Sequence, residues 1–444
     1  MRLFRTFLLA TAGLFSAQIG AAATAAPVLM ISIDGLRPAD VLHDRERGLN
    51  LPNLRALAAG GAYASGLRGV LPTVTYPNHT TLVTGVSPAR HGIVNNLTFD
   101  PQGRNAGGWY WYASDLHAPT LWDAVHAAGR RTASLGWPVT VGLRSIDANI
   151  PEYWRARTSE DAKLERVLAT PGLIETVEAA TGAKLDMGDT SPEQDAEKTK
   201  AALWIVRTRP AFFTLHLSSL DHQQHVYGPE STEGRSALTR IDEEVGMVVR
   251  AARAAQPDLV VAIVSDHGFA PVAHDINLAA AFVQAGLMQV DAAGSVVRWD
   301  AAPWNAGGSA AVVLARKDDA ALRARVAALL TTMAADPASG VGRVIDQAGI
   351  ARMGAAPEAD FFVDARIGYQ FGGAVTGPLV SAGTAKGTHG YFPEHPEMRA
   401  TLILSGPSVT RKGDLGDVDA RDVAPTLAKL LGVTLKGAEG HPLF

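Results

Sequence analysis

Apolar runs that end next to acidic or turn-forming residues constrain the fold of this chain more than any other feature. Asp34 directly follows the first run, Asp221 lies just beyond the second, and Asp266 follows the third. Short continuous apolar runs of this kind are typical of strands buried on both faces of a sheet. The runs span residues 28–33, 212–217, 259–264 and 401–404.

Helix-forming stretches separate these strands, at residues 52–59, 121–128, 196–206, 236–255 and 423–431. Strands that alternate with helices predict an α/β fold, with a largely parallel central sheet flanked by helices on both faces. Ligands of such folds bind beyond the carboxyl ends of the strands, where the acidic residues stand. Two less regular stretches, around 145–199 and 277–385, are predicted to insert on the sheet as loops or a cap.

The N-terminus has the pattern of an export signal. Arg2 and Arg5 precede an apolar run at 7–19 that is too short to span a bilayer, and small residues follow at 21–26. We therefore expect residues 1–26 to be a signal peptide and 27–444 to be one domain, periplasmic or secreted, without a membrane span. Losing the two arginines changes the formal net charge from −4 to −6, so nucleic acid is not expected as a stable partner. The sequence gives no indication of the oligomeric state.

The chain of 444 residues contains no cysteine, so any metal site must use His, Asp or Glu. Asp266 and His267 leave the end of a strand together, and Asp221 and His225 share one face of a helical turn. His389 stands in a turn rich in glycine. Each cluster alone is equally compatible with an ordinary polar turn.

Two further histidines receive different predictions. His222 lies on another face of the turn that carries Asp221, so we expect it at the surface or beside the ligands. His216 lies within an apolar strand and is expected to be a satisfied core histidine.

The segment 71–96 places a hydroxyl before a Pro-Asn turn that opens a predicted helix. A hydroxyl there lies near the positive end of the helix and can be ionised by a cation. The alternative is a plain helix start, with Thr75 or Asn78 as the cap. Thr73, Thr80 and Thr81 are also candidates, and spacing alone does not choose among them.

The string TYPNHTTLVTG at 75–85, followed by HGIVNN at 91–96, resembles the nucleophile region of the nucleotide pyrophosphatase/phosphodiesterase family of the alkaline phosphatase superfamily. The resemblance implies an alkaline-phosphatase-like fold and Thr75 as a nucleophile that becomes phosphorylated. It also implies that Asn96 contacts the phosphoryl oxygens and that Tyr76 flanks the substrate. Two zinc ions are implied, one held by Asp34, Thr75, Asp266 and His267 and the other by Asp221, His225 and His389.

The resemblance implies hydrolysis of phosphodiester or pyrophosphate bonds in nucleotides or related diesters. One alternative is a phosphomonoesterase of the same superfamily, but that branch adds a Lys-x-Arg pair, and 109–143 offers only Arg130 and Arg131 with no lysine. A zinc-binding pseudoenzyme is the other alternative, yet no nucleophile or ligand is lost.

The wall of the substrate site departs from the family pattern. The string SLGWPVTVG keeps Trp137 and Pro138 of the family's Trp-Pro-Gly but not its glycine. Tyr76, Trp109 and Trp137 are the aromatic residues expected to contact a second organic substituent. The aromatic run at 109–112 is equally compatible with a loop packed on its own protein.

Overall fold

The computed structural model describes residues 25–105, 107–153, 159–188 and 190–444. The predicted signal peptide therefore lies almost entirely outside the described residues, and export stays a prediction. None of the described helices has both the length and the apolar composition needed to cross a bilayer.

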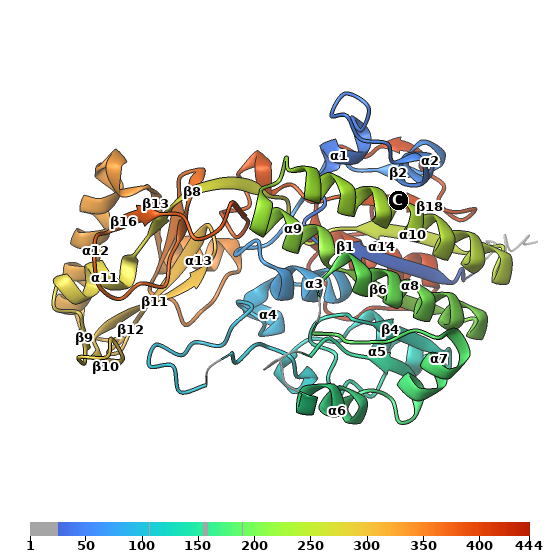
Figure 1. Cartoon of the computed structure of the whole chain (residues 1–444), viewed down its shortest axis with the longest axis horizontal. Coiled ribbons are helices and arrows are strands. Elements are labelled where there is room, and N and C mark those ends of the chain that lie inside the picture. Colours follow the sequence, from blue (N-terminus) through green and yellow to red (C-terminus); the bar gives the residue numbers. More distant parts are fainter. Residues whose placement is uncertain (1–24, 106, 154–158, 189) are drawn as a thin grey trace, which may run out of the picture.

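An eight-stranded sheet forms the centre of the larger lobe (Figure 1). Strands β7, β1, β6, β4 and β5 run parallel to one another, whereas β18 pairs with β7 in the antiparallel sense. The largely parallel sheet predicted from the sequence is therefore confirmed. In spatial order the strands are β19 (Gly413–Asp414), β2 (Ala62–Tyr63), β18 (Leu402–Ser405), β7 (Val260–Val264), β1 (Val28–Ile33), β6 (Phe212–Leu217), β4 (Thr132–Leu135) and β5 (Ala148–Ile150).

Strand β1 shows how the sheet is covered on both faces. Leu29, Ile31 and Ile33 point into a core formed with helices α2, α7, α8 and α10, whereas Val28 and Met30 point into a second core formed with α3, α5 and α14. Alternate residues of a strand face opposite sides, so a continuous apolar run fits a strand buried twice. The helices of this lobe are α1 (Pro38–Leu42), α2 (Pro52–Gly60), α3 (Thr75–Thr84), α4 (Pro88–His91), α5 (Leu121–Ala127), α6 (Ser159–Leu168), α7 (Leu173–Thr181), α8 (Pro192–Ile205), α9 (Ser219–Tyr227), α10 (Thr232–Ala255) and α14 (Val423–Leu431).

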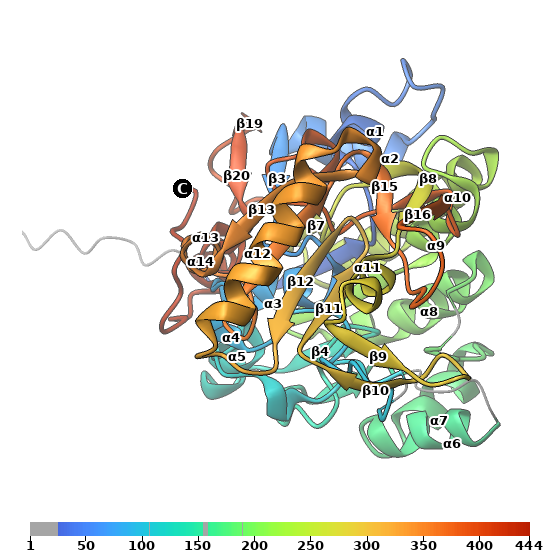
Figure 2. The same cartoon turned by 90° about the vertical axis from the view of Figure 1, so that its left-hand side faces the viewer.

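The stretch 277–385 folds into a smaller lobe with a regular structure of its own (Figure 2). Its four-stranded antiparallel sheet packs with α11 and α12 around a separate apolar core. In the sequence, this lobe lies between two of the candidate ligands, His267 and His389. Its elements are α11 (Leu278–Gln284), β9 (Met288–Val290), β10 (Val296–Trp299), β11 (Ala301–Ala306), β12 (Ser309–Leu314), α12 (Ala320–Ala335), β13 (Val341–Asp346), α13 (Gln347–Met353), β14 (Phe361–Ala365), β15 (Gly368–Phe371) and β16 (Val380–Ala382).

Both stretches expected to be less regular are therefore largely helix and strand. Within 145–199, β5 extends the central sheet, and α7 and α8 cover it. Strand β8 (Ala270–Ile276) leads from the larger lobe into the smaller one, and β17 (Gly387–Thr388) pairs with it on the return. In the larger lobe, β3 (Gly66–Arg68) and β20 (Asp417–Asp419) form a separate two-stranded sheet.

Candidate active site

The predicted ligands converge at the carboxyl ends of three neighbouring strands. Asp34 follows β1, Asp266 and His267 follow β7, and helix α9, which begins just after β6, carries Asp221 and His225. The return strand β17 delivers His389 to the same place. The position beyond the strand ends agrees with the expectation drawn from the apolar runs.

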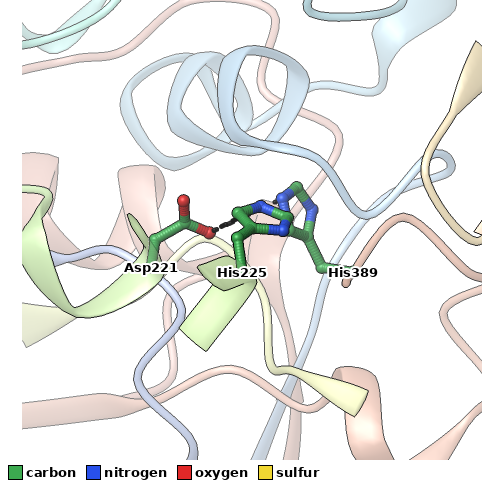
Figure 3. Close-up of side chains that lie close together, drawn as sticks. All are labelled: Asp221, His225 and His389. Atoms are coloured by element: carbon green, nitrogen blue, oxygen red, sulfur yellow. Dashed lines mark ion pairs between the residues drawn. The ribbon is translucent and has the colours of Figure 1, made fainter. Parts of the chain in front are cut away.

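Asp221, His225 and His389 form one cluster (Figure 3). The Oδ1 atom of Asp221 lies 3.5 Å from His225 Nε2 and 3.6 Å from His389 Nε2. Three ligand atoms within 4.8 Å of one another can surround a single cation.

Asp34, Asp266 and His267 form the adjoining cluster. The Nε2 atom of His267 lies 3.3 Å from Asp34 Oδ1 and 3.0 Å from Asp266 Oδ2. The rings of His267 and His389 stack with centroids 3.5 Å apart, so the two clusters adjoin each other. One oxygen of Asp221 also lies within 4.8 Å of ligand atoms of Asp34 and His267.

Backbone carbonyls orient all three histidines. The Nδ1 atoms of His225, His267 and His389 lie 2.9 to 3.0 Å from the carbonyl oxygens of Gly387, Gly268 and Thr73, respectively. A carbonyl oxygen only accepts, so each Nδ1 carries the proton and each Nε2 is left as a lone-pair donor to a metal.

The unsatisfied atoms of the two clusters fit a cation. Asp34 Oδ1, Asp221 Oδ1, Asp266 Oδ2 and His267 Nε2 are buried and have no hydrogen-bond partner among the described residues. Buried polar atoms without partners are costly, and cations bound in the two clusters would satisfy all four. Carboxylate and imidazole donors are those that zinc takes in the absence of cysteine.

The electrostatics of the clusters point the same way. Burial, together with the negative charges of Asp266 and Asp221, raises the pKa of Asp34 well above its ordinary range. Burial, together with the neighbouring imidazoles of His267 and His225, which disfavour a further positive charge, lowers the pKa of His389 well below its ordinary range. Like charges are thus forced together here, and cations between the ligands would relieve the repulsion among the carboxylates.

Of the four candidate threonines, Thr75 is the one that borders the cavity. The cavity has a volume of about 310 Å³ and is bordered by Thr75 together with ligands of both clusters. The hydroxyl groups of Thr73, Thr80 and Thr81 donate instead to the backbone carbonyls of Tyr391, Tyr76 and Val86. Thr75 also begins helix α3, whose positive end therefore lies at its hydroxyl.

Asn96 lies beside Thr75 on the cavity wall. Its Oδ1 atom accepts a hydrogen bond of 2.8 Å from the backbone N–H of Tyr76, which fixes the orientation of the amide. The amide N–H groups are left to donate into the cavity, because no described residue accepts from them.

The aromatic wall is smaller than expected. Tyr76 and Trp109 border the cavity and meet edge to face, with ring centroids 5.1 Å apart. The Tyr76 hydroxyl donates to Glu152 Oε1 at 2.6 Å, so the ring is also fixed in the protein core. Trp137, expected to contact the substrate, is fully buried against Trp122 and does not border the cavity, so that expectation was wrong.

Glu152 and His216 form a polar connection that sequence reasoning missed. Nδ1 of His216 lies 3.1 Å from Glu152 Oε2, and Nε2 lies 3.1 Å from Asp34 Oδ2. His216 is therefore buried and satisfied, as predicted, but it joins a metal-ligand candidate to the cavity wall. His222 is exposed at the rim. Glu152 lies in a stretch without a recognisable motif, so no sequence signal pointed to it.

Comparison with known proteins identifies the family. The sequence profile of the type I phosphodiesterase/nucleotide pyrophosphatase family matches residues 28–392. The chain belongs to this family. Its members are phosphoric ester hydrolases of the alkaline phosphatase superfamily.

Similar curated members of the nucleotide pyrophosphatase/phosphodiesterase family are longer proteins. The human ectonucleotide pyrophosphatase/phosphodiesterase family member 1 is 28% identical over 253 residues, which cover 54% of this chain and 23% of the human protein. The venom phosphodiesterase CdcPDE of Crotalus durissus collilineatus is 25% identical over 262 residues, covering 56% of this chain and 27% of the venom protein. The chain thus matches about a quarter of each relative's length.

Solved structures of family members share the fold. Human ectonucleotide pyrophosphatase/phosphodiesterase 5 superposes with a TM-score of 0.64 at 19% identity, covering 93% of this chain and 97% of the other. An inactive threonine-to-alanine variant of the murine protein, in complex with AMP, superposes with a TM-score of 0.62 at 20% identity, covering 94% of this chain and 97% of the other. The alkaline-phosphatase-like α/β fold is thereby confirmed.

Proposed function

We propose that this protein hydrolyses phosphodiester or pyrophosphate bonds of nucleotides or related diesters, with Thr75 as the nucleophile and two zinc ions as cofactors. The observation that carries the proposal is the position of the Thr75 hydroxyl, which borders a cavity lined by candidate ligands of both clusters. Relatives named as nucleotide pyrophosphatases and phosphodiesterases support it.

The ligand sets follow the two clusters and the family resemblance. Asp34, Thr75, Asp266 and His267 would hold one zinc ion, and Asp221, His225 and His389 the other. When bound, the ions would supply Lewis-acid chemistry, which lowers the pKa of Thr75 and of an attacking water and offsets charge on the leaving oxygen.

The residues of the chain perform the rest of the reaction. Thr75 Oγ1 attacks phosphorus, the bond to the leaving oxygen breaks, and the phosphoryl group is carried on Thr75 until water hydrolyses it. The amide of Asn96, turned into the cavity by its bond to the Tyr76 N–H, donates to the phosphoryl oxygens. The positive end of helix α3 favours the same negative charge.

The cavity wall supports a diester rather than a monoester. Among the residues that the structure describes, the wall includes Tyr76, Trp109 and Glu152 but no lysine or arginine. Arg130, one of the two arginines considered for the extra phosphate charge, donates to the carbonyl of Leu431 at the end of α14 instead. A monoester dianion would need further cationic donors, whereas a diester needs room and apolar contacts.

The test compares two substrates with the same leaving group. The p-nitrophenyl ester of thymidine monophosphate should be hydrolysed by the zinc-loaded protein with a higher kcat/KM than p-nitrophenyl phosphate. The two must be measured at one pH and one zinc concentration. A tenfold preference for the monoester, equivalent to about 1.4 kcal/mol in transition-state binding, would reject the diesterase assignment.

A further inference from the structure

A lysine lies buried directly behind the cavity wall. Lys198 of helix α8 has a side chain that is only 3% exposed. Its Nζ atom lies 3.4 Å from Asp195 Oδ1 and 3.1 Å from Ser218 Oγ. Ser218 itself borders the cavity, so the buried charge is connected to the substrate space through one hydroxyl group.

Asp195 fixes Ser218 as well as Lys198. Its two carboxylate oxygens accept the backbone N–H groups of Ser218, at 3.2 Å, and Ser219, at 2.9 Å. These are the first N–H groups of helix α9, which have no partner within the helix. The Ser218 backbone is therefore held in place at the start of the helix that carries Asp221 and His225.

The chemistry of Lys198 sets the direction of the Ser218 hydroxyl. An ammonium group donates hydrogen bonds and accepts none, so Ser218 Oγ must be the acceptor in this contact. The hydroxyl proton then points away from Lys198, and no described residue accepts it. A donor without an acceptor on the wall of a cavity is a feature of ligand recognition, because a ligand atom can complete the hydrogen bond.

The sheet order indicates which part of a substrate lies there. Ser218 follows β6, the strand between β1 and β4. Candidate ligands follow β7, β1 and β6, whereas Glu152, which also borders the cavity, follows β5 on the far side of β4. Ser218, at the end of β6, therefore borders the cavity between Asp34 and Glu152, on the side that the ligands after β7 leave for the organic substituent of a diester.

We propose that Ser218 is a specificity-determining residue, whose hydroxyl donates a hydrogen bond to an oxygen atom of the organic substituent that phosphorus carries. Lys198 is the positioning residue that orients this hydroxyl. A sugar oxygen or a base carbonyl of a nucleotide has the required chemistry. This inference rests on the proposed function.

The test uses two diesters with one leaving group, the p-nitrophenyl esters of thymidine monophosphate and of methyl phosphate. Both esters carry the oxygen that links the substituent to phosphorus, but only the nucleotide ester offers further oxygen acceptors, on its sugar and base. Ser218→Ala should lower kcat/KM for the nucleotide ester about tenfold, or about 1.4 kcal/mol, and change the methyl ester by less than about twofold. Ser218→Thr keeps a hydroxyl group and should retain most of the nucleotide activity.

Ser219→Ala is the matched control, because its hydroxyl is buried beside the same helix end but does not border the cavity. It should leave both rates within about twofold. Lys198→Met should reproduce the selective loss of Ser218→Ala, since the freed hydroxyl can turn to Asp195. Thermal unfolding of each variant identifies a loss due to misfolding, and Ser218→Ala remains informative if Lys198→Met does not fold.

The inference and the proposed function would be overturned by different results. Equal losses on both esters, or no loss in Ser218→Ala, would overturn this inference and leave the proposed function intact. Hydrolysis of neither ester by the zinc-loaded parent protein would overturn the proposed function, and the inference with it.

Discussion

Glu244 of helix α10 is buried beside the same Asp195, and its charge should make the stability of the protein depend on pH. Burial, reinforced by the negative charge of Asp195, raises the pKa of Glu244 from 4.5 to about 8. Its Oε2 atom has no hydrogen-bond partner among the described residues. The folded protein therefore binds this proton more tightly than the unfolded chain does.

The sign of the effect follows from linkage between protonation and folding. Below pH 4.5 the carboxyl group is neutral in both states and costs nothing. As pH rises from 4.5 to about 8, the unfolded chain ionises first and folding loses stability, and above about pH 8 the full penalty applies. A shift of this size corresponds to roughly 5 kcal/mol. Relaxation and water penetration reduce this, so we expect about 2 to 3 kcal/mol.

Glu244→Gln should remove the penalty without changing the side-chain volume. At this chain length 1 kcal/mol corresponds to about 1 to 2 °C, so the variant should unfold about 2 to 6 °C above the parent at pH 9 and at nearly the same temperature at pH 5. Scanning calorimetry at both pH values measures the difference. Glu233→Gln, which alters an exposed glutamate at the start of the same helix, is the control. An equal shift at both pH values would refute the reasoning, because it would show that the charge is not responsible.

Two further predictions concern the nucleophile and the metal ligands. Thr75→Ala should abolish turnover while metal content and folding largely survive, and Thr73→Ala, which removes a hydroxyl bonded to the Tyr391 carbonyl, should keep activity. Comparable residual activity in these two variants, measured with the nucleotide ester, would show that Thr75 is the wrong hydroxyl. His225→Ala should weaken zinc binding at one site more than at the other, measured by stepwise titration with a chelator. Equal loss of both ions would argue against separate ligand sets.

The central strands could be predicted because a short, continuous apolar run is stable only where both of its faces are buried, as in the middle of a sheet covered by helices. Residues 28–33 and 212–217 were predicted as strands and are strands with the same bounds. Strand β7 begins one residue later than predicted, and the fourth run forms β18. The antiparallel pairing of β18 could not be foreseen, since strand direction depends on the connection rather than on local composition.

The smaller lobe could not be predicted from periodicity. Its strand β12 reads SAAVVL and is buried throughout, while its partner β11 reads AAPWNA, with no alternation that marks a strand. Helix α12 is rich in alanine, which favours a helix but does not show which face is buried. The core forms only when these segments pack together, so no single segment carries the signal.

The candidate site was predictable to the extent that its residues belong to motifs. All seven candidate ligands and Asn96 lie at one place, although they come from segments far apart in the sequence. Lys198, Glu152 and Ser218 were missed because each joins the site through a side-chain contact across elements. The prediction for Trp137 was wrong although Trp137 does belong to a motif. The Trp-Pro string is shared with the family, but here the Trp137 side chain packs into the core.

The central claim is that Thr75 acts together with two zinc ions held by the two ligand clusters. The most direct measurement removes metal from the purified protein with a chelator, confirms its loss by elemental analysis and then titrates zinc back while hydrolysis of the nucleotide ester is followed. We predict that the metal-free protein is inactive and that activity rises to a plateau at about two zinc ions per chain. Full activity in the metal-free protein would contradict the account.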